Sequence, residues 1–274
     1  MSIVQKYRLI ASLLVYNGDV VQTRRFRPTN NVGSAFTAVD FFNGWTVDEI
    51  IVLEISKDDA YCARFQEIVE GLSRRCFVPL AVGGKIRDLD RVRAYTRAGA
   101  DKVALNTGAL QRPALVTEIA EQFGRQCVVV SIDARRNAQT PSGYEAVGER
   151  GRTPSGRDAR EWAQEVVERG AGEILLNEIE HDGDKRGYDL ALVRLLSDAV
   201  SVPVIAFGGV ANWDHLVEGV RQGHAHAVAA GNIFHYTEHS TKKAKEHMAA
   251  AGVPVRGTTF YKVAMPRRPT YRPF

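Results

Sequence analysis

A chain of 274 residues with 45% apolar residues is long enough to bury a sizeable core, in one large domain or two small ones. The formal net charge of +4 and a pI near 9.0 are mildly basic. The positive residues are spread along the chain, apart from the cluster Arg24 to Arg27 and a basic tail. This distribution argues against a nucleic-acid partner, which would need a concentrated patch, and favours anionic small molecules.

The cysteines Cys62, Cys76 and Cys127 are odd in number and lack C-x-x-C spacing. We therefore expect neither a disulfide framework nor a zinc knuckle, and we infer a reducing cytoplasm. Cys127 is expected to be a small core residue rather than a nucleophile. No segment approaches the roughly 20 apolar residues that a membrane span requires, so no membrane contact is expected.

Short apolar runs recur along the chain, and stretches with helical periodicity separate them. The runs predict strands at about 8–15, 49–55, 77–83, 101–105, 126–133, 172–178, 202–207 and 225–230. Helices are predicted between them, for example over 89–97, 113–123, 158–169 and 188–199. Eight βα units in about 250 residues have the size of a single (β/α)₈ barrel, also called a TIM barrel.

The chain also repeats itself at one offset. Glu49 and Glu173 begin similar runs 124 positions apart, and Val78 and Val202 share that separation. The paired glycines Gly83-Gly84 and Gly208-Gly209 are 125 positions apart. Two copies of a (βα)₄ half explain these matches, although chance similarity between parallel strands is the alternative. The duplication favours a closed barrel over an open doubly wound sheet.

Glycine pairs follow two of the predicted strands, at the end of the barrel where active sites lie. Glycine lets an anion approach the backbone N–H groups, and a following helix N-terminus favours negative charge. Polar or small residues end the strands beside each pair. These residues predict two phosphate-binding turns, with tight packing of the glycines as the alternative: Gly83, Gly84, Asn106 and Thr107 in one, and Gly208, Gly209, Gly231 and Asn232 in the other.

Residues 6 to about 256 resemble the HisF family, the cyclase subunit of imidazole glycerol phosphate synthase. The likeness rests on many ordered motifs: Arg8 to Gly18, Val82-Gly-Gly, Ala98 to Val103, Asn106-Thr107, Val128 to Ala134, Arg169 to Leu176, Asp182 to Asp189 and Phe207-Gly-Gly.

The resemblance implies a HisH-like glutaminase that docks under the barrel. Ammonia then passes through the barrel to a doubly phosphorylated substrate, and two aspartates act as acid and base. Asp133 occupies one of these two positions, whereas Leu14 occupies the other. Leucine cannot transfer a proton, so the chain keeps one of the two carboxylates. Lys85, Gln22, Phe207 and Asn177 also depart from the family pattern.

The family also has a ring of charged residues that gates ammonia entry at the opposite end of the barrel. Arg8, Glu49, Lys102 and Glu173 match this ring, and Asp101 matches a residue that faces the glutaminase. The simpler alternative is that charges at strand starts hold the barrel closed as ion pairs.

A branch of the family shows the same combination of a kept gate and altered chemistry. The first 55 residues resemble the AglZ/WbuZ-type acetamidino-modification proteins, through Leu13-Leu14, Asn17-Gly18, Thr23, Phe26 and the run from Val32 to Asn43. Such proteins accompany a HisH-like glutaminase and a separate sugar amidotransferase in surface-polysaccharide biosynthesis.

Several polar groups are left with two interpretations. Asp182, Gly183 and Asp189 follow the sixth strand and are either acid/base or ribose ligands or ordinary turn residues. The stretches 148–157 and 24–27 are predicted as flexible loops over the barrel mouth, and anion capture by their arginines is the alternative. The pairs His224/His226 and His235/His239 lack a recognised metal frame. We expect no metal and no cofactor.

Together these observations predict a barrel domain over 1–256 and a basic tail over 257–274. The expected function is that of a HisF-like synthase subunit which receives ammonia from a glutaminase and supports amidination of an acetamido sugar. A true histidine-pathway cyclase and a non-catalytic ammonia conduit are the alternatives.

Overall fold

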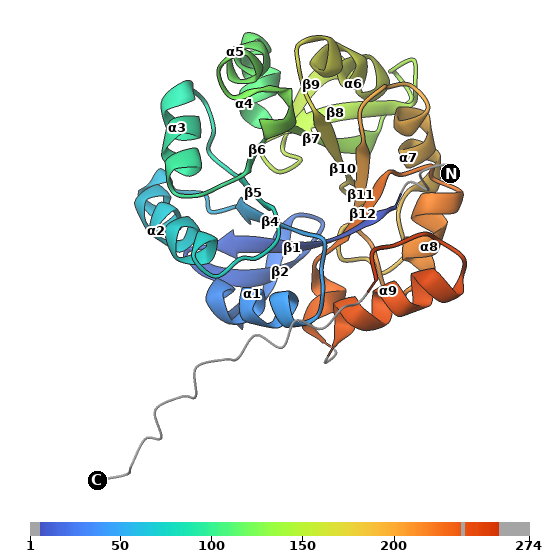
Figure 1. Ribbon diagram of the computed structural model, residues 1–274. Helices are drawn as coiled ribbons and strands as arrows, with labels where there is room; N and C mark the ends of the chain where they lie inside the picture. Colours follow the sequence, from blue (N-terminus) through green and yellow to red (C-terminus); the bar gives the residue numbers. More distant parts are fainter. Residues whose placement is uncertain (1–5, 237–238, 258–274) are drawn as a thin grey trace.

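In the computed structural model, which describes residues 6–236 and 239–257, eight parallel strands form a closed barrel. Figure 1 looks along this barrel and shows the helices as an outer ring around the strands. The strands pair in the order β10-β11-β12-β1-β4-β5-β6-β7, and β7 pairs with β10 from Glu173↔Val129 to Glu178↔Ala134. The bounds are Arg8–Tyr16 (β1), Glu49–Glu54 (β4), Leu80–Gly83 (β5), Lys102–Leu105 (β6), Val128–Arg136 (β7), Glu173–Glu178 (β10), Val204–Phe207 (β11) and Ala227–Ala230 (β12).

Each barrel strand is followed by a helix that packs on its outer face. Acceptor side chains start several of these helices: Ser34, Asp88, Asp158 and Asp189 each accept a hydrogen bond from a backbone N–H of the first turn. The helices are Ala35–Gly44 (α1), Cys62–Ser73 (α2), Leu89–Arg97 (α3), Thr107–Gln111 (α4), Ala114–Phe123 (α5), Ala159–Glu168 (α6), Leu190–Ser197 (α7), Asp214–Arg221 (α8) and Ser240–Ala250 (α9), with 3₁₀ turns at Asp59–Tyr61, Arg125–Cys127 and Asn232–His235.

The predicted (β/α)₈ barrel and its eight strands are confirmed, with β5, β7, β11 and β12 beginning two or three residues later than expected. β5 begins at Leu80 and β11 at Val204, each directly after a proline. Proline has no N–H to donate to the ladder, so Pro79 and Pro203 contribute only their carbonyl oxygens, to Ile50 and Ile174. The repeated glutamates occupy the first position of β4 and of β10.

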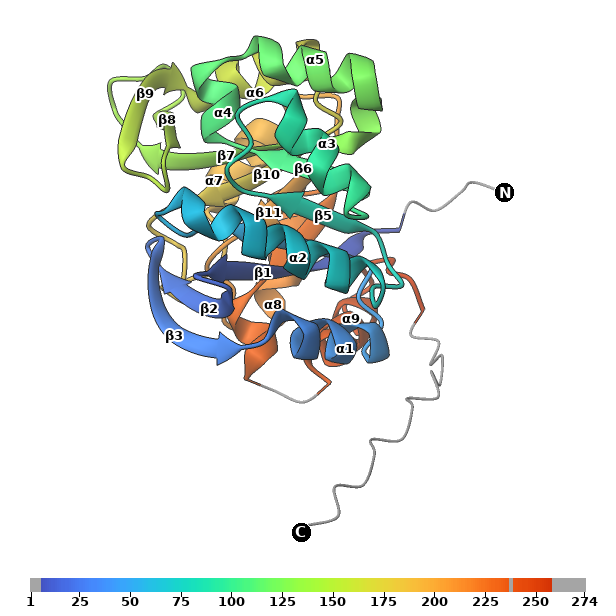
Figure 2. The same cartoon turned by 90° about the vertical axis from the view of Figure 1, so that its left-hand side faces the viewer.

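Two antiparallel hairpins extend the barrel at one end, and Figure 2 shows both on the same side of the molecule. Asp19–Arg24 (β2) and Arg27–Gly33 (β3) follow β1, and Tyr144–Gly148 (β8) and Thr153–Asp158 (β9) follow β7. The stretches 24–27 and 148–157, which were predicted as loops, are parts of these hairpins: strand residues make up half of 24–27 and most of 148–157, and turns make up the rest. The Asn17-Gly18 pair, with φ of 55° and 93°, makes the turn into β2, and it is a recognised hairpin signal.

The core has two layers because successive side chains of a strand point to opposite faces. Leu9, Ala11 and Leu13 of β1 belong to the layer between strands and helices. Ile10 belongs to the barrel interior, and Leu14 packs against that interior cluster. The interior is apolar and includes several small residues: Ala81, Ala104, Ala227 and Ala229, beside Ile51, Val129, Leu175, Ile205 and Phe207.

Candidate active site at the carboxyl ends of the strands

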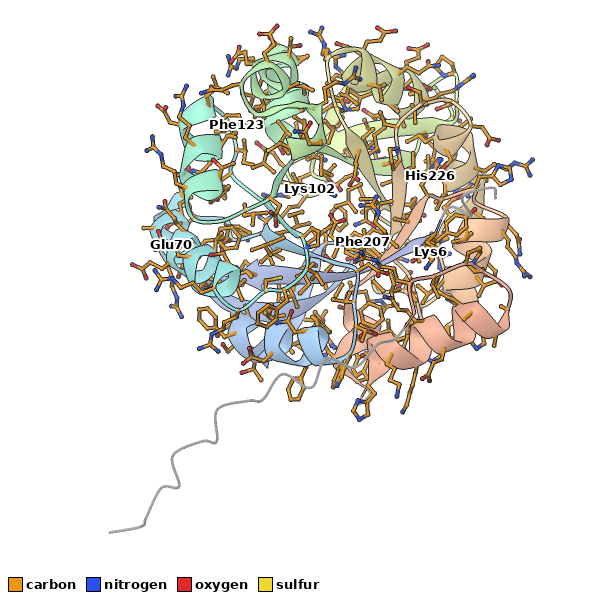
Figure 3. The ribbon with its side chains drawn as sticks, viewed as in Figure 1. Lys6, Glu70, Lys102, Phe123, Phe207 and His226 are labelled. Atoms are coloured by element: carbon orange, nitrogen blue, oxygen red, sulfur yellow. The ribbon has the colours of Figure 1, made fainter. Side chains whose placement is uncertain are left out.

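Two cavities open where the barrel strands end. The larger, of about 300 Å³, lies over β4, β5, β6 and β7, and the smaller, of about 100 Å³, lies over β11 and β12. Leu14, Thr23 and Phe207 line both cavities. Figure 3 shows Phe207 near the centre of the ring of strands. The mouth is therefore divided by Leu14 and Phe207, with the two predicted phosphate-binding turns on either side.

Asp133 lies in the larger cavity, near the carboxyl end of β7, and pairs in register with Asn177 of β10. Part of its surface faces the cavity, and protein atoms surround the rest. Burial raises the pKa of Asp133 to about 7, the Asp182 carboxylate adds to the rise, and a hydrogen bond with Ser131 opposes it. A carboxyl group with a pKa near neutrality can both give and take a proton at physiological pH.

Leu14 lies on β1, across the barrel from β7, at the end of the apolar interior. It pairs in register with Leu53 of β4 and Val21 of β2. Its side chain is half-buried and faces the same mouth as Asp133. No proton can be exchanged there. The site thus holds one centrally placed aspartate, with an apolar group at the position where the sequence comparison expected a second.

Further buried acceptors line the larger cavity. Glu54 Oε2 and Asn177 Oδ1 have no hydrogen-bond partner among the residues that the structure describes. Burial raises the pKa of Glu54, whose other oxygen accepts from the Ser56 N–H at 2.6 Å. Sequence reasoning did not single out Glu54, although Glu54 and Glu178 are equivalent in the repeat and could have been found from it.

The glycines of both turns are required by close packing. Gly84 has φ 113°, and a Cβ there would lie 2.5 Å from the Glu54 carbonyl oxygen. Gly209 has φ 83°, and its Cβ would lie 2.2 Å from the Gly187 carbonyl oxygen. Gly83 and Gly208 are equally crowded, by Ala104 and by the Asn177 side chain. Packing alone therefore explains these glycines, and their role in phosphate binding stays a prediction.

The polar residues that were predicted to accompany these turns lie in the expected cavities. Asn106 and Thr107 line the larger one, where Thr107 Oγ1 accepts from the Glu149 N–H at 2.9 Å. Gly231 and Asn232 line the smaller one, where Asn232 Nδ2 donates to the Thr23 carbonyl at 2.9 Å. The fold thus brings each predicted group together across two strands.

Asp182 and Gly183 lie beneath the β2–β3 hairpin. Asp182 accepts from Thr23 Oγ1 at 3.1 Å and from the Phe26 N–H at 2.9 Å, and it is 4% exposed. Burial raises its pKa. A Cβ on Gly183 would lie 2.2 Å from the Thr23 carbonyl oxygen. Asp182 therefore fastens the hairpin over the smaller cavity, which it also lines.

Asp189 has the turn-making role that was one of its two interpretations. Its Oδ1 accepts from the Leu192 N–H at 3.1 Å and so caps α7. Its Oδ2 accepts from Tyr144 Oη at 2.9 Å and pairs with Arg136 at 2.7 Å. Asp189 lines neither of the two cavities.

Basic side chains surround the rim of the larger cavity. Lys85 replaces the usual glycine with φ 57°, and its ammonium pairs with Asp59 at 2.9 Å. Arg87 pairs with the other Asp59 oxygen at 2.9 Å. The cavity lining contains the cations Lys57, Lys85, Arg87, Arg150 and Arg152, against the carboxylates Glu54, Asp133 and Glu149. This excess of positive charge favours an anionic ligand.

The predicted charged ring lies at the other end of the barrel. Arg8 contacts Glu49 at 2.6 Å and Glu173 at 3.0 Å, and Lys102 contacts each glutamate at 3.0 Å. Lys102 is labelled near the centre of Figure 3. The pKa of Glu49 is raised above its ordinary value because the effect of burial exceeds the opposing effects of Lys102 and Arg8. Asp101 is exposed beside this ring and accepts from the Leu80 N–H at 2.8 Å.

No group of three or more His, Cys, Asp or Glu residues with the geometry of a metal site occurs within residues 6–236 and 239–257. Nor does any helix in this part of the chain have the length and apolar character to cross a membrane. Cys127 is buried, as expected for a core residue.

The sequence matches the family model described as histidine biosynthesis protein over residues 8–240. This match spans the barrel from β1 to the start of α9, so both cavities and the charged ring fall within it. Enzymes of this family share the (β/α)₈ barrel found here. The chain belongs to the family of histidine biosynthesis proteins, of the HisF/HisA type.

Proposed function

We propose that this chain is a HisF-like synthase subunit that receives ammonia from a HisH-like glutaminase and supports the amidination of a sugar, from acetamido to acetamidino. The observation that carries the proposal is that the two ends of the same barrel hold different polar groups. A closed ring of four charges lies at the start of the strands, and a single aspartate with a pKa of about 7 lies in a cation-rimmed cavity at their end.

Ammonia chemistry suits the larger cavity for two reasons. Amidination moves protons onto and off nitrogen, and Asp133 supplies one group able to do both near neutral pH. Glu54 and Asn177 line the same cavity, and each has one buried acceptor oxygen without a hydrogen-bond partner among the described residues. Acceptors of this kind suit the N–H groups of ammonia or of an amidine.

Cyclisation of the histidine-pathway intermediate is the alternative, and Leu14 argues against it. The family reaction uses two aspartates, and loss of one acid or base commonly removes a factor of about 10²–10⁴ in rate. Here the second position is apolar, and Phe207 lies beside it in the narrow part of the mouth. We expect the purified chain, given the ribulosyl bisphosphate intermediate and an ammonium salt, to form only trace imidazole glycerol phosphate. Robust turnover would overturn the proposal.

Acid/base catalysis and simple ammonia conduction are separated by Asp133→Asn in a reconstituted amidination assay with an ammonium salt. The assay contains the chain and a sugar amidotransferase, and it needs no glutaminase. An acid/base role predicts a rate loss of about 100-fold or more. A conduit predicts no change. Asp90→Asn, on the exposed face of α3, is the matched control because Asp90 lines neither cavity.

A further inference from the structure

The turn between β8 and β9, residues 149–152, crosses the mouth of the larger cavity. The Glu149 N–H donates to Thr107 Oγ1 at 2.9 Å, after β6, and Arg150 Nη1 donates to the Ile55 carbonyl at 2.6 Å, after β4. Gly151 lies so close to Ile179, after β10, that an added Cβ would be 2.7 Å away. The turn therefore contacts the ends of three barrel strands and covers the space between them.

The turn is held in a conformation that most side chains avoid. Glu149, Arg150 and Gly151 have φ of 48°, 59° and 77° in succession. A non-glycine residue in the left-handed region costs roughly 1–2 kcal/mol, and such residues persist where surrounding contacts hold them, often at ligand sites. The contacts with Thr107 and Ile55 provide that restraint.

Arg150 differs in its charge balance from Lys85 and Arg87, two other basic residues of the cavity lining. Lys85 and Arg87 share the Asp59 carboxylate. In contrast, Arg150 is half-buried in the cavity wall and donates to the Ile55 carbonyl, and no carboxylate within 6–236 and 239–257 lies within salt-bridge distance of it. Burial lowers the pKa of Arg150, and the charge of Arg152 lowers it further, while Glu149 and Glu54 act on it only at longer range. A partly desolvated cation without a counter-ion favours a bound anion.

We propose that Arg150 is an anion-binding residue that caps the larger cavity, and that it holds the phosphate of a phosphomonoester against the Gly84-Lys85 and Asn106-Thr107 segments. A phosphate dianion matches the several donors of a guanidinium and would also meet the Thr107 hydroxyl. The inference deepens the proposed function, since it names the group that closes the same cavity over its substrate, and it rests on that function.

Calorimetric titration of the full chain with ribose 5-phosphate, and separately with inorganic phosphate, tests the assignment. Arg150→Met removes the charge, and Arg150→Gly removes it while relieving the left-handed backbone. We expect both variants to bind ribose 5-phosphate about tenfold or more weakly, as for the loss of a charge-assisted hydrogen bond. Arg125→Met is the matched control. Arg125 lies before β7 and outside both cavities, and it also donates to a backbone carbonyl, that of Val167 in α6.

Thermal unfolding separates binding from a merely structural role. If Arg150 served only to fasten the turn, Arg150→Gly would lower the unfolding temperature in proportion to any loss of affinity. We expect this variant to unfold at or above the wild-type temperature and still to lose affinity. Mass spectrometry after phenylglyoxal treatment gives a site-resolved readout, in which ribose 5-phosphate should protect Arg150 and leave Arg125 unprotected.

Affinity within about twofold of wild type in both variants would refute the assignment, as would a wild-type chain that binds neither probe. If inorganic phosphate is bound as tightly as ribose 5-phosphate, with the same loss in both variants, the ligand class widens to free phosphate and the role of Arg150 stands. None of these titrations contains ammonia or a glutaminase. An unaffected Asp133→Asn variant in the amidination assay would therefore remove the acid/base role without touching the anion cap.

Discussion

Asp133 stabilises the fold only while it is protonated. Its pKa of about 7 in the folded protein lies above the ordinary value of 3.8, so the folded chain holds this proton more tightly than the unfolded chain. The resulting stabilisation is fully present below about pH 4 and is lost as the pH rises to about 7. A site that needs this carboxyl group therefore carries an energetic cost at neutral pH.

Asp133→Asn should remove that pH dependence. Asn cannot ionise, so we expect the variant to match wild type near pH 4 and to exceed its stability well above pH 7 by up to about 4 kcal/mol. Urea unfolding followed by circular dichroism at several pH values measures the difference. Asp90→Asn, whose carboxylate is exposed, should follow the wild-type curve throughout. A constant offset between Asp133→Asn and wild type at all pH values would contradict the raised pKa.

Leu14 tests how far the apolar side of the mouth tolerates a carboxylate. Leu14 packs against the barrel interior beside Leu53 and Phe207. We expect Leu14→Asp to destabilise the fold by about 1–3 kcal/mol, and by more at pH 8 than at pH 5, because the charged form is poorly solvated there. Leu14→Asn, which stays neutral, is the matched control and should show no such pH trend in urea unfolding.

Among the elements, the β2–β3 hairpin depends on two aspartates after β10. Asp182 accepts hydrogen bonds from Thr23 Oγ1 and from the Phe26 N–H of the hairpin. Asp184 pairs with Arg24 at 2.7 Å and with Arg25 at 3.0 Å, and hydrogen bonds from these two arginines lower its pKa to about 2. The carboxylate therefore stays charged, and the hairpin stays fastened over the smaller cavity, at every pH at which the protein would be assayed.

Asp184→Asn should loosen this hairpin. The two arginines lie at its tip, where trypsin cleaves, so we expect faster cleavage after Arg24 and Arg25 at an unchanged unfolding temperature. Mass spectrometry of timed digests gives the rate at each site. Cleavage after Arg125, at the far end of the barrel, is the internal control. Equal rates at the hairpin in wild type and variant would show that Asp184 does not hold it.

At the scale of the whole molecule, the charged ring closes the end of the barrel opposite the cavities. It contains two cations and two anions, and each cation contacts both glutamates. Glu49 is 1% exposed, so it depends on these partners for its charge. The charges of the ring therefore balance as a unit. Replacing one charged residue should lower the free energy of unfolding more than replacing a cation and an anion together.

Lys102→Met should leave two glutamates with one arginine and destabilise the fold by about 2–4 kcal/mol. Adding Glu173→Gln restores the balance, because the direct Arg8–Glu49 pair at 2.6 Å remains. We expect the double variant to be more stable than Lys102→Met alone. Urea unfolding of the two single variants and the double variant completes the cycle, and additive losses would show that the ring is not coupled.

Much of the site was predictable because strand ends in a closed barrel meet at one mouth. Asp133, Asn106-Thr107, Gly231-Asn232 and the glycine pairs all lie near or just after the carboxyl ends of strands, so the barrel prediction alone brought them together. The ring of Arg8, Glu49, Lys102 and Glu173 was predicted from the resemblance to HisF proteins, and each of the four residues begins a strand. The missing carboxylate at Leu14 was also visible in the sequence.

Arg150 and the two hairpins were not predictable in this way. Their positions depend on contacts between residues far apart in the chain, such as Arg150 with Ile55 and Asp182 with Thr23. The glycines gave an ambiguous signal, because a close backbone approach and an anion site require the same absence of a side chain. The stretch 258–274, most of the predicted basic tail, lies outside the described residues.

The sequence by itself determined the eight-stranded barrel and the residues at its two ends, because alternating apolar patterns and strand-end motifs are local, and the resemblance to HisF proteins identified the single central aspartate. Only the tertiary structure decided the raised pKa of Asp133, the division of the mouth by Leu14 and Phe207, and the cap formed by Arg150. These properties depend on burial and on long-range contacts, which exist only once the barrel has closed.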